Sequence, residues 1–141
     1  MSATPLAALA RTSAPQSMLR RFLALDAAVT GANALAYLAF SGPLGRFLGV
    51  DAALLLAVGA FLAAYAAGVG LLASRRQPPA LGVRAVVDAN LAWTAVSLVA
   101  LALWLSPSTA GGVWTVLQSL VVAAFAALQY SALRVRQGRS A

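Results

Sequence analysis

The sequence predicts an all-α integral membrane protein in which four transmembrane helices form an up-down-up-down bundle with both termini in the cytoplasm. Composition, four long apolar segments and the placement of arginine support this prediction. Of the 141 residues, 62% are hydrophobic and only 9% are charged, whereas about a quarter of the residues of a soluble domain are charged. Because so short a chain has little interior, we expect hydrocarbon to surround most of its side chains.

The four apolar segments each contain 19 to 23 residues. About 20 helical residues are needed to cross a hydrocarbon core that is ~30 Å thick. The predicted spans are residues 22–40, 52–74, 85–105 and 113–133. They divide the chain into a cytoplasmic N-terminal tail (1–20), a transmembrane domain (21–134) and a cytoplasmic C-terminal tail (135–141).

Residues that favour turns separate these spans. Ser41-Gly42-Pro43 ends the first span, and Asp51 is placed to cap the second helix. Gln77-Pro78-Pro79 and the segment 106–112 form the other two breaks. Because all three connections are short, we expect helices that follow one another in sequence to be antiparallel neighbours.

The arginine residues predict the orientation of the bundle in the membrane. Nine of the ten arginines flank the termini or the middle connection, and Arg46 alone lies on the other side. Basic residues in short loops remain in the cytoplasm, so both termini are predicted to be cytoplasmic. Trp104 and Trp114 fall at the opposite ends of spans three and four, where indole rings anchor at the headgroup level.

Missing residue types narrow the classes of function. The chain contains no Cys, His, Glu or Lys, and these residues provide most metal ligands, haem ligands and acid–base catalysts. We therefore expect no metal site and no cofactor. Nucleic acid is also not an expected partner, because the arginines stand beside apolar runs instead of forming a basic domain.

Polar residues follow one face of the first predicted span. Asp26, Thr30, Asn33 and Tyr37 are spaced by four, three and four residues, which places them on the same side of a helix. Later spans carry further polar residues: Asn90, Thr94, Ser97, Gln118 and Gln129. Two interpretations remain open. These side chains form hydrogen bonds between helices, or they line a polar cavity that binds or conducts a solute.

The three aspartates have different surroundings in the sequence. Asp51 is explained by capping. Asp88 lies four residues after Arg84 and can pair with it on one helix face, whereas Asp26 has no arginine at that spacing. Since Asp26 and Asp88 lie at similar depths, we expect both carboxylates to join one polar cluster at the cytoplasmic end of the bundle. The candidate binding or transport cluster is therefore Asp26, Thr30, Asn33, Tyr37, Asp88, Asn90 and Gln118.

Small residues form two rows along span two, and such rows allow helix backbones to approach closely. The first row is Ala53, Ala57, Ala60, Ala64 and Ala67, and the second is Gly59, Ala63, Ala66 and Gly70. If the first row packs inside the bundle, leucine at position 60 or 64 should force helices apart. The alternative is that a small-residue face forms the seam of a homo-oligomer.

Four arginines at the predicted cytoplasmic rim also permit two interpretations. Positive-inside topology alone accounts for them, or they bind the anionic headgroups of lipids, since basic pockets on that side of a membrane hold such groups. The four residues are Arg20, Arg21, Arg84 and Arg134.

Two stretches, residues 25–33 and residues 105–118, resemble small four-span integral membrane proteins of actinobacteria. The resemblance covers roughly residues 20 to 133. It implies a four-span architecture in a bacterial plasma membrane and carries over no chemical activity.

Three functional hypotheses follow. The first is a non-enzymatic scaffold, accessory or assembly subunit that self-associates in the lipid bilayer. The second is an oligomeric transporter or channel for an ion, a proton or a small solute that uses the polar face with Asp26 and Asp88. The third is an intramembrane enzyme acting on lipid, whose acid–base chemistry would depend on aspartate and tyrosine alone.

Overall fold

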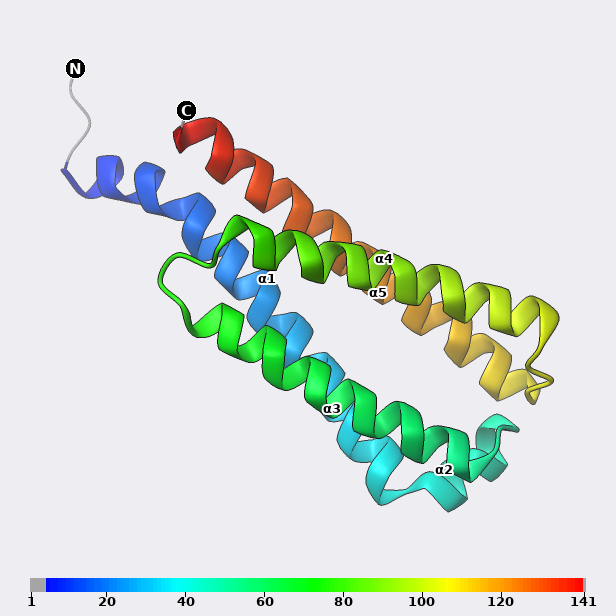
Figure 1. Cartoon of the computed structure of the whole chain (residues 1–141). Coiled ribbons are helices and arrows are strands. Elements are labelled where there is room, and N and C mark those ends of the chain that lie inside the picture. Colours follow the sequence, from blue (N-terminus) through cyan, green and yellow to red (C-terminus); the bar gives the residue numbers. More distant parts are fainter. Residues whose placement is uncertain (1–4, 141) are drawn as a thin grey trace.

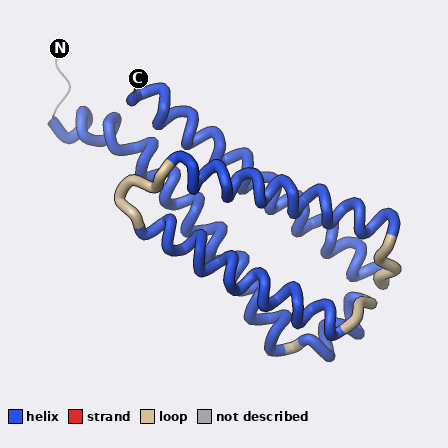
Figure 2. Tube along the Cα trace, in the orientation of Figure 1, coloured by secondary structure: helices blue, strands red, loops and turns tan. Residues whose placement is uncertain are grey.

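The computed structural model describes residues 5–140, with side chains described for residues 16–138. The described chain is helical and contains no strand (Figures 1 and 2). Its helices are α1 (Pro5–Ala39), α2 (Ser41–Leu48), α3 (Ala52–Ser74), α4 (Ala80–Leu103) and α5 (Thr109–Ser140). Four of them contain segments long and apolar enough to cross a membrane, so the predicted all-α, four-span bundle is confirmed.

The helix boundaries differ from the predicted spans mainly at the ends. Helix α3 covers the predicted residues 52–74, and the Asp51 carboxylate caps it by accepting a hydrogen bond from the Ala53 N–H at 3.1 Å. Helix α4 begins at Ala80, directly after Pro79. Helices α1 and α5 extend into the segments expected to be tails, of which residues 1–4 and 141 lie outside the described residues.

The short helix α2 replaces the loop expected after the first span. Pro43 stands in its first turn, where a backbone N–H has no partner within the helix and its absence costs little. Gly49 ends the helix in the left-handed conformation, with φ at 71°, and its N–H donates to the Gly45 carbonyl. Glycine adopts this conformation without the steric cost that other residues meet.

The four long helices form two hairpins. Helices α1 and α3 pack along each other, as do α4 and α5, and α1 also packs against α5. Both termini and the α3–α4 connection lie at one end of the molecule, which we call the terminal end (Figure 1). Helix α2 and the α4–α5 connection lie at the opposite, distal end.

The backbones of α3 and α4 lie further apart than those of the other neighbouring long helices, so these two antiparallel helices meet mainly through side chains. Large side chains explain the separation. The ring of Phe61 in α3 stacks on that of Trp93 in α4, with centroids 5.8 Å apart and planes at 12°. The Tyr65 hydroxyl reaches across to the Asn90 side chain at 2.9 Å. Aromatic rings thus bridge a distance that small residues would have closed.

A cluster of ten buried apolar residues, which we call the apolar core, lies in the terminal half of the bundle. Its members come from all four long helices and occupy the part of each helix nearest the terminal end. They are Leu19, Leu23, Val69, Ala73, Val83, Val86, Val87, Ala126, Ala132 and Leu133. The bundle is therefore closely packed near the termini, and this cluster does not extend into its distal end.

Close packing of α1 on α3 uses the second row of small residues. A Cβ added at Gly59 would lie 3.0 Å from Leu38 Cγ and 3.1 Å from Tyr37 Cβ, so the two helices meet tightly there. Further along, Gly31 faces Ala66 at ordinary van der Waals distance. Among the members of this row, Gly59 is buried and Ala63 is exposed.

The first row of small residues does not pack inside the chain. All five of its members, Ala53, Ala57, Ala60, Ala64 and Ala67, are exposed on α3. The interpretation of this row as internal packing was wrong, so its members give no reason to expect that leucine at position 60 or 64 forces the helices of one chain apart. The two rows lie on different sides of one helix, and only the Gly59 side faces α1.

Contacts at the distal end join the two hairpins a second time. The Ser108 N–H donates to the Leu48 carbonyl at 3.1 Å, and the Ser108 hydroxyl donates to the Phe47 carbonyl at 2.7 Å. A Cβ at Gly111 would overlap the Leu48 carbonyl oxygen. We call these contacts the distal clasp. They hold α2 against the start of α5.

Candidate functional site

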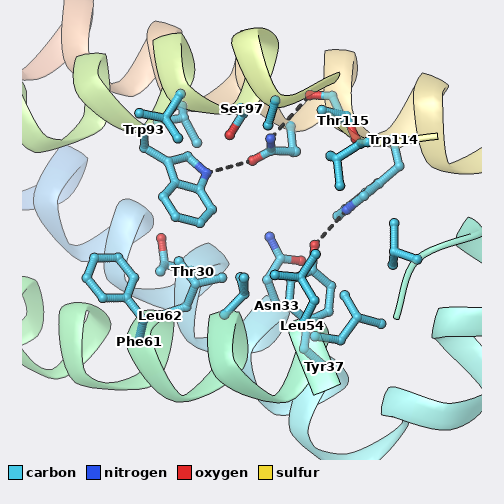
Figure 3. A pocket seen from close by; sticks show the side chains of 18 of the residues that line it. Thr30, Asn33, Tyr37, Leu54, Phe61, Leu62, Trp93, Ser97, Trp114 and Thr115 are labelled. Atoms are coloured by element: carbon cyan, nitrogen blue, oxygen red, sulfur yellow. Dashed lines mark hydrogen bonds between the residues drawn. The ribbon is translucent and has the colours of Figure 1, made fainter. Parts of the chain in front are cut away.

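A cavity of about 490 Å³ lies between the two hairpins, in the half of the bundle that the apolar core leaves unfilled. All four long helices contribute to its wall, and Leu48, Val50 and Leu105 border it at the distal end. Most of the lining side chains are aliphatic or aromatic. Figure 3 shows the polar side chains that face one another across this space.

A buried carboxylate lies just below the cavity, toward the terminal end. Asp26 is 2% exposed and accepts three hydrogen bonds. Thr30 donates to one carboxylate oxygen at 3.0 Å, and the side-chain amides of Asn90 and Gln129 both donate to the other at 2.8 Å. All three donors are neutral. The carboxylate is therefore stabilised by oriented dipoles from α1, α4 and α5.

The same hydrogen-bond network continues beyond Asp26. The Asn90 amide also donates to the Gln129 side-chain oxygen at 3.1 Å, and the Asn90 oxygen accepts a bond from Tyr65 of α3. One network thus involves all four long helices. Within the described residues, no buried polar side-chain atom lacks a hydrogen-bond partner. We call Asp26, Thr30, Tyr65, Asn90 and Gln129 the carboxylate network.

Asp88 does not belong to this network, so the expected convergence of Asp26 and Asp88 was wrong. Asp88 is exposed on α4, whereas Asn90 is 4% exposed and contacts Asp26 directly. The reason is geometric. Residues two positions apart in a helix are separated by about 200° around the helix axis. A helix that turns Asn90 inward therefore turns Asp88 outward.

Two indole rings are fixed by hydrogen bonds in the cavity wall. The Trp114 N–H donates to the Tyr37 hydroxyl at 2.7 Å, which joins α5 to α1. The Trp93 N–H donates to the Gln118 side-chain oxygen at 3.1 Å. The Gln118 amide nitrogen donates in turn to the Thr115 carbonyl and the Ser119 hydroxyl. Gln118 therefore positions Trp93, and its hydrogen-bonding groups already have partners.

Two other polar side chains line the cavity without such partners. Asn33 extends from α1 and Ser97 from α4, on opposite sides of the open space (Figure 3). In the described part of the chain, neither side chain forms a hydrogen bond. These two side chains are therefore free to form hydrogen bonds with a molecule inside the cavity.

The cavity opens sideways, between α3 and α4. Its lining residues on α1 and α5 are partly or fully buried, whereas several on the α3 and α4 sides are strongly exposed. Phe61 is 56% exposed, Val96 62% and Trp104 73%. Because the distal clasp borders one end and the carboxylate network the other, the exposed part of the cavity wall lies between α3 and α4.

The structure brings together six of the seven residues of the predicted cluster. Five of them, Thr30, Asn33, Tyr37, Asn90 and Gln118, line the cavity, and Asp26 bonds to two of these. Two members of the network, Tyr65 and Gln129, were missing from the prediction. The sequence did indicate that Gln129 faces the bundle interior, because it stands nearly in line with Gln118 in an otherwise apolar span.

The four predicted lipid-binding arginines have different surroundings. The Arg20 side chain donates to the Ala73 carbonyl at 3.0 Å and so helps to hold α1 against the end of α3. Arg134 donates to the Tyr130 hydroxyl and lies over its ring, 5.7 Å from the centroid. Arg21 and Arg84 are exposed near the terminal end.

No protein-family model, curated protein or solved structure matches the chain. The function is therefore inferred from the cavity, its opening and the network below it.

Proposed function

We propose that this chain is a non-enzymatic, multi-pass protein of a bacterial plasma membrane that holds a small lipophilic molecule between its two hairpins. The observation that carries the proposal is the cavity between α3 and α4. Its volume of about 490 Å³ lies within the range of ~300–1,000 Å³ that is typical of small-molecule sites. Such sites are mostly apolar with a few placed polar groups, as this one is.

The route into the cavity supports a ligand that is dissolved in lipid. The opening lies along helices that are long and apolar enough to cross a membrane. In the proposed location it would face acyl chains instead of water. The arginine distribution favours cytoplasmic termini, which would place the cavity in the outer half of the bilayer. A molecule in the outer leaflet would then reach the cavity by lateral diffusion between α3 and α4.

The character of the cavity wall supports a non-enzymatic role. None of the described residues that line it is charged. The nearby Asp26 carboxylate is buried and accepts bonds from three neutral donors, so it is occupied as an acceptor. Acid–base catalysis needs a titratable group within hydrogen-bond reach of the reacting atom, and the wall offers only the Tyr37 and Tyr65 hydroxyls.

Transport through a single chain has less support than binding. The apolar core fills the terminal half of the bundle, so the cavity ends at the carboxylate network and does not continue toward the termini. A pore would therefore have to form between copies of the chain. Self-association remains part of the proposal, since the exposed alanine row on α3 offers a flat, small-residue face. Anionic headgroups remain proposed partners of Arg21 and Arg84.

A substitution that fills the cavity tests the proposal. Ala100 lines the cavity, whereas Ala95 of the same helix is exposed and lies outside the lining. Native mass spectrometry of protein extracted from membranes in mild detergent should show a bound small molecule on the wild type and on Ala95→Phe. Ala100→Phe should carry little or none. Equal occupancy of Ala100→Phe and the wild type, or no bound molecule on either, would contradict the proposal.

A further inference from the structure

Three hydrogen-bonding groups in the cavity have unused capacity. The Asn33 amide and the Ser97 hydroxyl have no partner within the described chain. The Tyr37 oxygen accepts a bond from Trp114, but its own proton has no acceptor among the described residues. Figure 3 shows Asn33 and Tyr37 reaching from α1 into the space that Ser97 faces from α4. These groups together offer several donors and at least one acceptor to a bound molecule.

The wall beside these groups disfavours a charged ligand. No arginine lines the cavity to neutralise an anion, and the Asp26 carboxylate below would repel one. A cation would be attracted by Asp26, but Thr30, Asn90 and Gln129 surround that carboxylate, which is 2% exposed. Moving an ion out of water without a partner of opposite charge is strongly unfavourable.

The remaining surface suits an extended apolar body. Phe61 and Trp93 form a stacked pair on the α3 and α4 sides of the cavity. Phe61 is also more than half exposed, so this pair borders the lateral opening. A ligand whose polar group met Asn33 and Ser97 could extend its apolar part past these rings toward the acyl chains.

We infer that the ligand is an uncharged lipophile whose polar group is a carbonyl oxygen or a hydroxyl, held by Asn33, Ser97 and Tyr37. The inference rests on the proposed binding function and names the chemical class of the ligand. A carbonyl oxygen would accept bonds from the Asn33 amide and from the Ser97 or Tyr37 hydroxyl. A ligand hydroxyl would also donate to the Asn33 side-chain oxygen.

Five probes with a common chain separate the classes of ligand. The full-length protein in lipid nanodiscs is titrated with dodecan-2-one, dodecan-1-ol, dodecanoate, dodecylammonium or dodecane. Native mass spectrometry measures the bound fraction, and empty nanodiscs correct for partitioning into lipid. The ketone and the alcohol should bind about threefold to tenfold more tightly than the other three probes, because a single hydrogen bond changes the dissociation constant by about that ratio.

Variants of Asn33 and Ser97 test whether these side chains form hydrogen bonds with the ligand. Asn33→Leu and Ser97→Ala should each weaken binding of dodecan-2-one by about threefold to tenfold and leave binding of dodecane unchanged. Thr115→Val is the matched control, because the Thr115 hydroxyl also borders the cavity but already donates to the Gly111 carbonyl at 2.8 Å. Melting curves check that each variant is folded, and Ser97→Ala alone is sufficient if Asn33→Leu fails to fold.

The outcomes separate the two proposals. If no probe binds the wild type, the proposed binding function fails together with the inference. If dodecane binds as tightly as the ketone, the cavity takes acyl chains and the polar recognition is wrong. If dodecanoate or dodecylammonium binds most tightly, the cavity stands and the assignment to an uncharged ligand is overturned.

Discussion

At the scale of single residues, Asp26 shows how a carboxylate is accommodated inside a membrane bundle without a cationic partner. Its oxygens accept bonds from a hydroxyl and two amides, so the compensation comes from neutral dipoles. Bonds to an ionised acceptor are stronger than bonds between neutral groups. The arrangement makes Asp26 the point at which α1, α4 and α5 are joined.

Substitutions of Asp26 test this role. Asp26→Asn should keep near wild-type stability, because the new amide oxygen can accept from Asn90 and Gln129 while its nitrogen donates to the Thr30 hydroxyl. Asp26→Leu should lower the free energy of unfolding by about 1–3 kcal/mol, since two buried amides lose an acceptor. Thermal melting in detergent, followed by circular dichroism, measures both. A leucine variant as stable as the wild type would show that the network contributes little.

At the scale of elements, α3 presents two small-residue faces with different surroundings. The Gly59 side meets α1 so closely that there is no room for a larger side chain. The Ala60 side is exposed on the surface of the single chain. Since lipid provides no hydrophobic force between helices, close backbone approach on the first face helps to hold the α1–α3 hairpin together.

Adjacent substitutions distinguish the two faces. Gly59→Leu should destabilise the protein by about 1–3 kcal/mol, because the added atoms must displace Leu38 and Tyr37. Ala60→Leu should leave the stability of the monomer unchanged. If it also abolishes a dimer seen by cross-linking in membranes, the exposed row is the seam of self-association. Equal melting temperatures for the two variants would contradict the assignment of the faces.

At the scale of the whole molecule, the two ends of the bundle differ in both packing and charge. The terminal half contains the apolar core and most of the arginines, whereas the distal half contains the cavity and Arg46. If the termini are cytoplasmic, the closely packed half faces the cytoplasm and the hollow half faces the exterior. Orientation therefore decides which leaflet delivers a ligand.

Reporter fusions test the orientation. Fusions after Ser74 and at the C-terminus should have cytoplasmic activity, because arginine-rich segments stay inside. Fusions at Gly45 and Thr109, which lie at the distal end, should have extracytoplasmic activity. An extracytoplasmic signal from the C-terminal fusion would invert the orientation and would place the cavity in the inner leaflet.

The sequence was sufficient to predict the four long helices, but not the short helix α2 or the rotation of the helices about their own axes. Span lengths follow from apolar runs, and the cap at Asp51 follows from its position. Which of Asp88 and Asn90 turns inward depends on packing against α5, and the flanking arginines gave no information about it. The separation of α3 from α4 depends on Phe61, Tyr65 and Trp93 meeting across it, which is a tertiary property.

The carboxylate network has a consequence for how the protein is synthesised. Asp26 enters the membrane with the first hairpin, but Asn90 and Gln129 follow 64 and 103 residues later in the chain. Until the second hairpin inserts, Asp26 has only Thr30 from its own helix. A chain that stops after α3 therefore leaves a carboxylate without most of its partners in hydrocarbon, which is an unfavourable state. The first hairpin therefore depends on the second to satisfy its buried carboxylate.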